Sequence, residues 1–196
     1  MFPVFSVREI LFETVFVPEI IETTRLQLRK PRHEDADAMF AAYAQDPAVT
    51  RYLIWRPHPR ISETHAVIDR FLEQWSAGTA FNWLLFGRDT HELVGSIGAR
   101  IKDNGFDIGY LLAQPWWGKG LMVEAICAVT DWAFTQPSVS RVSAACDVEN
   151  RASARALEKA GFRRERMAER YSIHPNISPD PRDCYLYAKM KSGSQL

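Results

Sequence analysis

The sequence predicts an α+β fold, in which the strands of a mostly antiparallel sheet are flanked by helices. Three observations lead to this class. Residues 80–86 and 92–101 read as consecutive strands joined by a short turn, an arrangement typical of antiparallel pairing. Residues 106–112 place side chains alternately on two faces, with the period of another strand. Helical spacing follows at 121–133 and 150–160, separated by a strand pattern at 142–148.

The N-terminal half predicts one strand and two helices. From Glu22 to about residue 30 the chain reads as a strand with Leu26 and Leu28 on one face. A helix is expected to begin near His33, with acidic residues in its first turn and Met39, Phe40 and Tyr43 buried. Residues 50–60 show neither period and read as a loop or a short helical turn. A second helix is expected with Ser62 as its N-cap, and Gly78 follows its end.

The C-terminal part, after Phe162, reads as a strand, a proline-bearing loop and a last strand at 184–189. Such a loop could line a substrate pocket. We expect a single domain over residues 21–190, preceded by an extension (residues 1–20) whose role the sequence leaves open and followed by a disordered tail (residues 191–196).

The composition restricts the classes of function. The 24 basic and 24 acidic residues cancel, so no nucleic-acid footprint is expected. No segment has the length and apolarity of a membrane span, and no membrane partner is expected. The three cysteines form no C-x-x-C pair, which suits a reducing cytoplasm, and the five histidines show no metal-ligand spacing. We therefore expect a cytoplasmic protein without a metal, as a monomer or a homodimer.

A glycine turn at Gly118-Lys119-Gly120 precedes the first of the two C-terminal helices. The first amides of a helix have no intrahelical partner and carry the positive end of the helix dipole, so phosphate binds there readily. Glycine lets the backbone approach a phosphate closely, and Lys119 adds a positive charge. Taken alone, this turn is equally consistent with a plain connection between a strand and a helix.

The second helix also begins with polar residues suited to a ligand. Asn150 is a good N-cap, and Ser153 falls at the third helical position. At the other end, Gly161 fits the position after the helix and Phe162 the hydrophobic contact that follows such a cap. Two helix N-termini are therefore expected to face one ligand.

These segments resemble the GNAT superfamily of N-acetyltransferases. WWGKGLMVEA resembles the acetyl-CoA pyrophosphate motif Q/R-x-x-G-x-G/A of that family, with Pro115 in place of Gln or Arg, and NRASARALEKAGF resembles its Asn-x-x-Ser helix. Within the superfamily the chain most resembles the branch that includes the ribosomal-protein N-terminal (alanine/serine) acetyltransferases, through TTRLQLRKPRHEDADAMF, WRPH, DIGYLL, GFRRE and RDCYLYA. The resemblance covers about residues 21–190.

The resemblance implies a GNAT fold whose sheet is splayed at the acetyl-CoA site, and acetyl-CoA as a co-substrate. The pantetheine arm would pair with the strand end at Leu111, Leu112 and Ala113, where a backbone amide near Leu112 could hold the oxyanion. The phosphates would lie on the turn and the first helical residues, and Asn150 would hydrogen-bond the pantetheine. The residues implied there are Trp117, Gly118, Lys119, Gly120, Leu121 and Met122.

Two catalytic residues are expected from the same resemblance. Ser153 would lie near the sulfur and protonate the departing thiolate. The alternative is that Asn150 only caps the helix and Ser153 only occupies its third position. Glu165 is the first candidate for the general base; it is equally consistent with an exposed strand residue in the charged run RRER. Asp107 is a second candidate; by strand alternation, it is equally consistent with a residue that faces a covering helix or solvent. Cys146 is rejected as a nucleophile, because a small thiol on the apolar face of a strand is an ordinary core residue.

The acceptor pocket is expected to be formed by aromatic residues, which can hold a peptide or a small amine by apolar and cation–π contact. The candidates are Tyr52, Trp55, Trp83 and Tyr171; the alternative for Trp55 and Trp83 is that each belongs to the core. The chain is thus expected to transfer acetyl directly from acetyl-CoA to a primary amine, with a protein or peptide N-terminus as first choice. A small-molecule amine, such as an amino sugar or a polyamine, and a non-catalytic CoA-binding sensor remain as alternatives.

Overall fold

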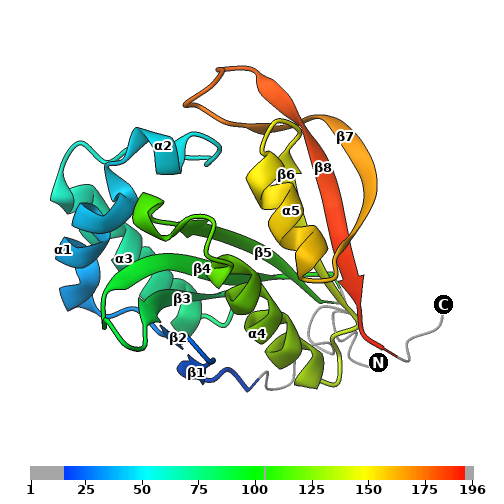
Figure 1. The fold of residues 1–196 in the computed structure, drawn as a ribbon, viewed down its shortest axis with the longest axis horizontal. Helices are drawn as coiled ribbons and strands as arrows, with labels where there is room; N and C mark the ends of the chain where they lie inside the picture. The colour runs from blue at the N-terminus through cyan, green and yellow to red at the C-terminus, as the bar shows by residue number, and fades with distance from the viewer. Residues whose placement is uncertain (1–15, 104, 193–196) are drawn as a thin grey trace, which may run out of the picture.

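The computed structural model describes residues 16–103 and 105–192. A single mixed sheet of eight strands in the order β1-β2-β3-β4-β5-β6-β8-β7 forms its centre (Figure 1). The strands are β1 (Ile20–Glu22), β2 (Leu26–Arg29), β3 (Ala80–Gly87), β4 (Leu93–Lys102), β5 (Gly105–Leu112), β6 (Arg141–Asp147), β7 (Arg163–Ile173) and β8 (Pro181–Met190). The predicted extension, residues 1–20, lies mostly outside the described residues, as does most of the predicted tail.

The sheet is antiparallel except where β5 meets β6. These two strands run parallel and pair only over Gly105–Asp107 and Arg141–Ser143, after which they diverge (Figure 1). The part of β5 that follows, from Ile108 to Leu112, is paired only on its β4 side. The predicted mostly antiparallel sheet is therefore confirmed, and its splay is the separation of β5 from β6. We call this separation the sheet opening.

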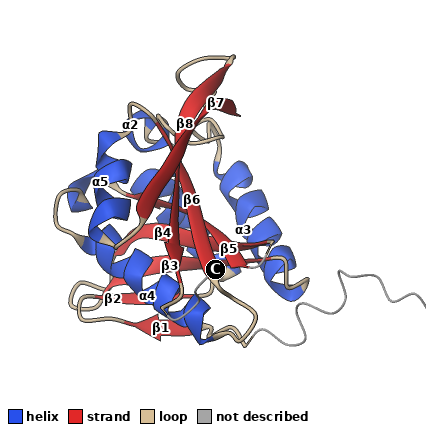
Figure 2. Ribbon diagram, turned by 90° about the vertical axis from the view of Figure 1, so that its right-hand side faces the viewer, coloured by secondary structure: helices blue, strands red, loops and turns tan. Residues whose placement is uncertain are grey.

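Helices cover both faces of the sheet (Figure 2). On one face lie α4 (Leu121–Thr135) and α5 (Arg151–Lys159), which pack on the larger core cluster. The other face carries α1 (Ala36–Met39), a π-helical turn (Phe40–Ala44), α2 (Pro47–Thr50) and α3 (Ile61–Ser76), which pack on a second cluster. Within the described ranges, no helix is long and apolar enough to cross a membrane.

Aromatic rings from three elements form the centre of the larger core. Trp83 on β3 and Trp132 on α4 meet edge to face with ring centroids 5.1 Å apart, and Phe106 lies 5.1 Å from Trp132. Such pairs add to the free energy gained by burying their large apolar area. The indole nitrogens of Trp83 and Trp132 donate to the carbonyls of Pro18 and Phe16. The end of the N-terminal extension therefore satisfies two polar groups at the edge of the core.

The structure corrects three details of the N-terminal half. The expected first strand is shorter than predicted: β2 covers only Leu26–Arg29, because a turn from Thr23 to Leu26 separates it from an additional short strand, β1. The expected helix near His33 begins as a 3-10 turn and continues through α1 into the π-helical turn. Ser62 is not an N-cap, because α3 begins at Ile61 with Arg60 before it.

Candidate active site

The glycine turn leads into α4 as the sequence predicts. Gly118 and Gly120 both have left-handed backbones, with φ of 75° and 77°, and no atom lies within 4 Å of a Cβ built on Gly118. The first hydrogen bond of α4 runs from the amide of Glu124 to the carbonyl of Gly120. The amides of residues 121–123, which include Leu121 and Met122, therefore lack an intrahelical acceptor. This geometry suits a phosphate group.

Arg25 stands beside this turn, although it precedes it by more than 90 residues in the chain. Its guanidinium donates to the carbonyl of Lys119 at 2.8 Å and forms an ion pair with Glu124 at 2.7 Å. Burial alone would raise the pKa of Glu124, but hydrogen bonds from Thr23 and Arg25 outweigh it and lower the pKa. Glu124 thus stays charged and holds Arg25 at the turn. Sequence spacing gave no signal for this second cation.

Trp117 connects the turn to the end of β5. Its indole nitrogen donates to the carbonyl of Leu112 at 2.7 Å, while about half of the residue is exposed. Ala113 is buried, its amide donates to Val94, and its carbonyl accepts from Trp116. The strand end predicted to pair with the pantetheine is Leu111, Leu112 and Ala113. Within it, both backbone groups of Ala113 already have hydrogen-bond partners in the fold.

The second helix begins with a side-chain cap. The Oδ1 of Asn150 accepts from the amide of Ser153 at 3.1 Å, which confirms Asn150 as the N-cap. The hydroxyl of Ser153 lies 2.8 Å from that of Tyr110 on β5. Burial raises the pKa of Tyr110, so its phenol remains protonated. The helix cap and the splayed strand are thus joined by one hydroxyl pair.

Cys146 lies on the buried face of β6. Burial raises the pKa of its thiol to about 11, although a hydrogen bond with Ser153 opposes this shift. A thiol with such a pKa is almost fully protonated near neutral pH and is a poor nucleophile. The structure therefore agrees with the rejection of a covalent acyl-enzyme at this position.

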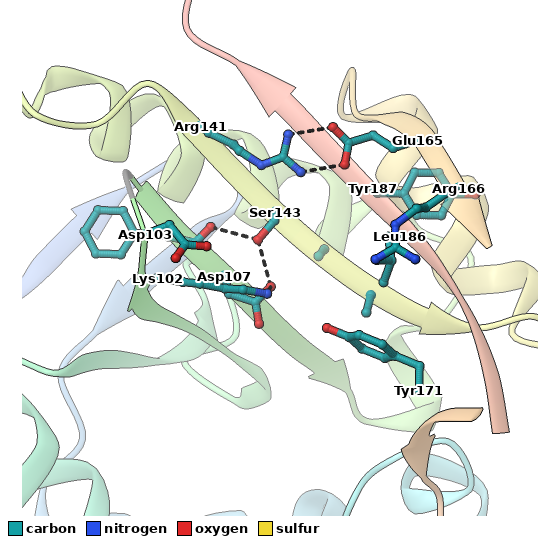
Figure 3. A pocket seen from close by; sticks show the side chains of 13 residues that line it. Lys102, Asp103, Asp107, Arg141, Ser143, Glu165, Arg166, Tyr171, Leu186 and Tyr187 are labelled. Carbon is teal, nitrogen blue, oxygen red and sulfur yellow. Dashed lines mark hydrogen bonds and ion pairs between the residues drawn. The ribbon is translucent and has the colours of Figure 1, made fainter. Parts of the chain in front are cut away.

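A cavity of about 280 Å³ lies on the opposite face of the sheet, beside the β5–β6 pairing (Figure 3). Its walls come from the β4–β5 turn and from strands β5 to β8. Residues 106, 144 and 146 face the α4 side, so by strand alternation the side chains of Asp107 and Ser143 point to this other face. The charged residues that line the cavity are Lys102, Asp103, Asp107, Arg141, Glu165 and Arg166.

Both candidate bases line this cavity, but each is engaged by a cation. Glu165 accepts from both terminal nitrogens of Arg141, and these hydrogen bonds lower the pKa of its carboxyl (Figure 3). Asp107 accepts from Ser143 at 2.8 Å and from Arg100 at 3.1 Å. An ion-paired carboxylate with a lowered pKa is a weak proton acceptor. The geometry therefore argues against Glu165 as the general base.

The four predicted acceptor residues lie in three places. Tyr171 on β7 is 44% exposed and lines the cavity. Tyr52 and Trp55 lie half-buried in the loop between α2 and α3, where Trp55 packs against His58 with ring centroids 4.9 Å apart. Trp83 is a correction: it is fully buried among the core aromatics and cannot contact an acceptor. Among the residues that the structure describes, no three potential metal ligands gather in one group.

Comparison with protein families decides what this arrangement is. The model of the acetyltransferase (GNAT) domain matches residues 25–163, which include the glycine turn, the Asn150 helix and the sheet opening. The chain belongs to the GNAT acetyltransferase family. It is accordingly an acetyltransferase, and the N-termini of α4 and α5 are parts of its GNAT domain.

Individual relatives carry the same activity in their names. This chain is 32% identical over 173 residues to the uncharacterized N-acetyltransferase YoaA of Bacillus subtilis, with 87% of this chain and 97% of that protein covered. It is 29% identical over 172 residues to the [ribosomal protein uS5]-alanine N-acetyltransferase of Escherichia coli, with 80% and 85% covered. A solved structure of RimL, described as a ribosomal alpha-N-protein acetyltransferase in complex with coenzyme A, matches with a TM-score of 0.78 at 22% identity, covering 88% of this chain and 98% of that one.

Proposed function

We propose that this GNAT protein transfers acetyl from acetyl-CoA directly to a primary amine in a ternary complex. One observation carries the proposal: the N-termini of α4 and α5 lie on one face of the sheet, and the cavity lies on the other face beside the sheet opening. Acetyl-CoA would lie along the N-termini of α4 and α5, and the acceptor would approach from the cavity. Gly109 follows Asp107 on the cavity face of β5, and no atom lies within 4 Å of a Cβ built on it, so the space directly beside Gly109 is open.

The phosphates of acetyl-CoA would lie on the turn Gly118–Gly120, with Lys119 and Arg25 as nearby cations. Trp117 and the strand end at Leu111 and Leu112 would flank the pantetheine. Asn150 accepts the cap bond through its Oδ1, so its amide nitrogen can donate to a pantetheine carbonyl. These assignments are consistent with neighbours of known structure, such as RimL, that bind coenzyme A.

The reaction forms one C–N bond and breaks one C–S bond. The neutral amine attacks the thioester carbonyl, and a backbone amide near Leu112 stabilises the oxyanion. Ser153 donates its proton to the departing thiolate sulfur, while Tyr110 donates to the Ser153 oxygen. Because Arg141 weakens the basicity of Glu165, we propose water in the cavity as the acceptor of the ammonium proton. Solvent then returns one proton to Ser153, so that the net change is amine and thioester to amide and thiol.

A protein or peptide N-terminus is the acceptor that we favour, because a relative that matches most of this chain is named a [ribosomal protein uS5]-alanine N-acetyltransferase. A small amine is the second candidate, since the cavity is modest in volume and mixed in charge. Tyr171 on its wall would contact either acceptor, and Tyr52 and Trp55 would contact it from the side of their loop.

Calorimetric titration with acetyl-CoA, followed by a thiol-release screen of peptides and small amines, tests this proposal. Binding at one site with micromolar affinity and release of free CoA with a peptide N-terminus are the expected results. Binding without thiol release for any amine would favour the CoA-binding sensor. Failure to bind acetyl-CoA would overturn the proposed function.

A further inference from the structure

The loop between α2 and α3, residues 51–60, has no helix or strand of its own. It carries Tyr52 and Trp55, and it follows α2, which packs on the β1–β5 half of the sheet through Val49. Within that half, the backbone hydrogen bonds of residues 52–59 are one turn from Leu53 to Thr50 and one bond from His58 to Ala44. The conformation of residues 51–57 must therefore be fixed by other contacts.

One such contact is the bond from the Tyr52 hydroxyl to the carbonyl of Glu149 at 3.5 Å, and the shorter ones come from the β7–β8 connection, on the other side of the sheet opening. The side-chain amide nitrogen of Asn176 (Nδ2) donates to the carbonyls of both Thr50 and Trp55, each at 2.7 Å. An asparagine amide has two hydrogens, so both are used to join the two ends of the segment 50–55. One side chain thus fixes the span of the loop that carries Tyr52.

His174 makes a third contact of the same kind. Its Nδ1 lies 2.7 Å from the carbonyl oxygen of Tyr52, and because a carbonyl only accepts, Nδ1 carries the hydrogen. The residue is only 5% exposed, and its Nε2 faces Cys184 at 3.7 Å and Asp147 at 3.9 Å. Asp147 is in turn held by Arg182 at 2.6 Å. The histidine is therefore anchored on β6 and β8 while it holds the loop.

These bonds connect parts of the chain more than 120 positions apart, across the place where β5 and β6 have separated. In Figure 1 the tip of the β7–β8 hairpin reaches over toward α2. We call the pair His174 and Asn176 the loop clamp. The clamp joins the two halves of the domain at the open end of the sheet, whereas the β5–β6 pairing joins them at the closed end.

We propose that His174 and Asn176 are positioning residues, which hold the loop of residues 51–60 so that Tyr52 and Trp55 meet the acceptor. The inference rests on the proposed function, because it places the acceptor between this loop and the cavity. It makes acceptor recognition depend on two side chains that need not touch the acceptor. Acetyl-CoA binding should depend on them less than acceptor binding does. The glycine turn shares no hydrogen bond with the clamp, and the loop reaches the Asn150 cap only through the Tyr52 hydroxyl, which donates to the neighbouring carbonyl of Glu149 at 3.5 Å.

Four variants of the full chain test the clamp. Asn176→Ala removes both donors to the loop, and His174→Leu removes the third. His174→Asn keeps an N–H donor near the position of Nδ1 and should restore the contact. Asp180→Ala in the same connection is the matched control, since Asp180 bonds to the Ser178 hydroxyl through its backbone amide, which the substitution keeps.

Hydrogen exchange of residues 50–57 gives a readout that does not need turnover. We expect Asn176→Ala and His174→Leu to accelerate exchange in this segment at least tenfold while α4 and α5 keep their protection. In steady-state kinetics, KM for the acceptor should rise about 5- to 100-fold for Asn176→Ala, since a net hydrogen bond is worth roughly 2- to 12-fold and two are lost. The dissociation constant of acetyl-CoA should stay within twofold, and His174→Asn should restore most of the loss.

The two readouts separate the possible failures. Unchanged exchange in residues 50–57 would overturn the clamp, whatever the activity. Accelerated exchange with an unchanged acceptor KM would show that the clamp holds the loop without positioning the acceptor, and would overturn the inference. If the wild-type protein binds no acetyl-CoA, the proposed function fails, and the exchange result still decides whether the clamp exists.

Discussion

The phenolic oxygen of Tyr110 lies 2.8 Å from the hydroxyl oxygen of Ser153, so that a residue of the splayed strand contacts the first turn of α5. A hydroxyl has one hydrogen to donate. If the phenol donates to Ser153, the serine proton is free to point at the sulfur of a thioester. Burial keeps Tyr110 protonated, so it can play this part throughout the neutral and mildly alkaline range.

The Tyr110–Ser153 pair predicts a non-additive double-mutant cycle. Ser153→Ala should lower kcat about 10- to 1000-fold, because the thiolate loses its proton donor. Tyr110→Phe should lower kcat several-fold in the wild-type background and hardly at all in Ser153→Ala, because its effect acts through the serine. Acetyl-CoA affinity, measured by calorimetry, serves as the control and should change little. Equal effects of Tyr110→Phe in both backgrounds would contradict the pairing.

Substitutions at Gly120, whose backbone is left-handed, test whether the glycine turn binds phosphate. Gly120→Asp places a negative charge where phosphate should lie, and acetyl-CoA affinity should fall at least 100-fold. Gly120→Asn is the matched control, because asparagine fills the same space and tolerates positive φ equally well without adding charge. We expect the asparagine variant to bind much more tightly than the aspartate variant. Equal affinity in the two variants would remove the electrostatic role of the turn.

Glu165 and Arg141 can be tested as a pair. If the carboxylate serves only as the partner of the guanidinium, Glu165→Gln and Arg141→Gln should lower kcat/KM by similar, small factors, and the double variant should be no worse than either. Because hydrogen bonds from Arg141 lower the pKa of Glu165, the pH profile of kcat/KM should carry no limb near neutrality that disappears in Glu165→Gln. A loss of 100-fold confined to Glu165→Gln would restore this residue as the general base.

Asp147 predicts how stability depends on pH. Burial would raise its pKa, but hydrogen bonds from Arg182 and from the amide of Glu149 outweigh burial and lower it below the usual 3.8. A carboxyl with a lowered pKa stabilises the fold above its unfolded value, and this stability is lost as pH falls below about 4. Asp147→Asn should therefore cost about 3 kcal/mol at pH 7, as expected when a buried ion pair loses one partner.

Urea unfolding of the wild type and Asp147→Asn at pH 7, 5 and 3 measures this contribution. The difference between the two proteins should be nearly constant from pH 7 to 5 and should shrink at pH 3. A difference that does not change with pH would mean that Asp147 acts through packing and not through its charge.

The sequence predicted the segments in which local pattern and local chemistry coincide. The glycine turn, the Asn150 cap and the strands on either side depend on residues within a few positions of one another, and all are present in the fold. The helical segment at 33–44 was harder to predict from the sequence, because a 3-10 turn and a π-helical turn interrupt the period of an α-helix. Ser62 shows the limit of capping rules, because α3 starts one residue before it.

The features that the sequence did not predict depend on pairs of residues far apart in the chain. Arg25 reaches the glycine turn from the position before β2, and His174 and Asn176 reach the loop of residues 51–60 from the connection between β7 and β8. A single arginine or asparagine gives no periodic signal, so only the folded chain shows its partner. Trp83 was misplaced for a related reason: alternation along β3 gives two faces but does not say which of them is covered by α4.

The hydrogen bond from Trp117 to Leu112 joins two places where opposite ends of one long ligand would lie. The indole belongs to the turn proposed for the phosphates, and the carbonyl belongs to the strand end proposed for the pantetheine. A shift of either segment must therefore stretch this bond or carry the other segment with it. Fragments of the ligand should consequently not bind as independent parts: occupancy of the nucleotide end should alter the affinity of the thiol end, and the same bond would transmit the effect in both directions.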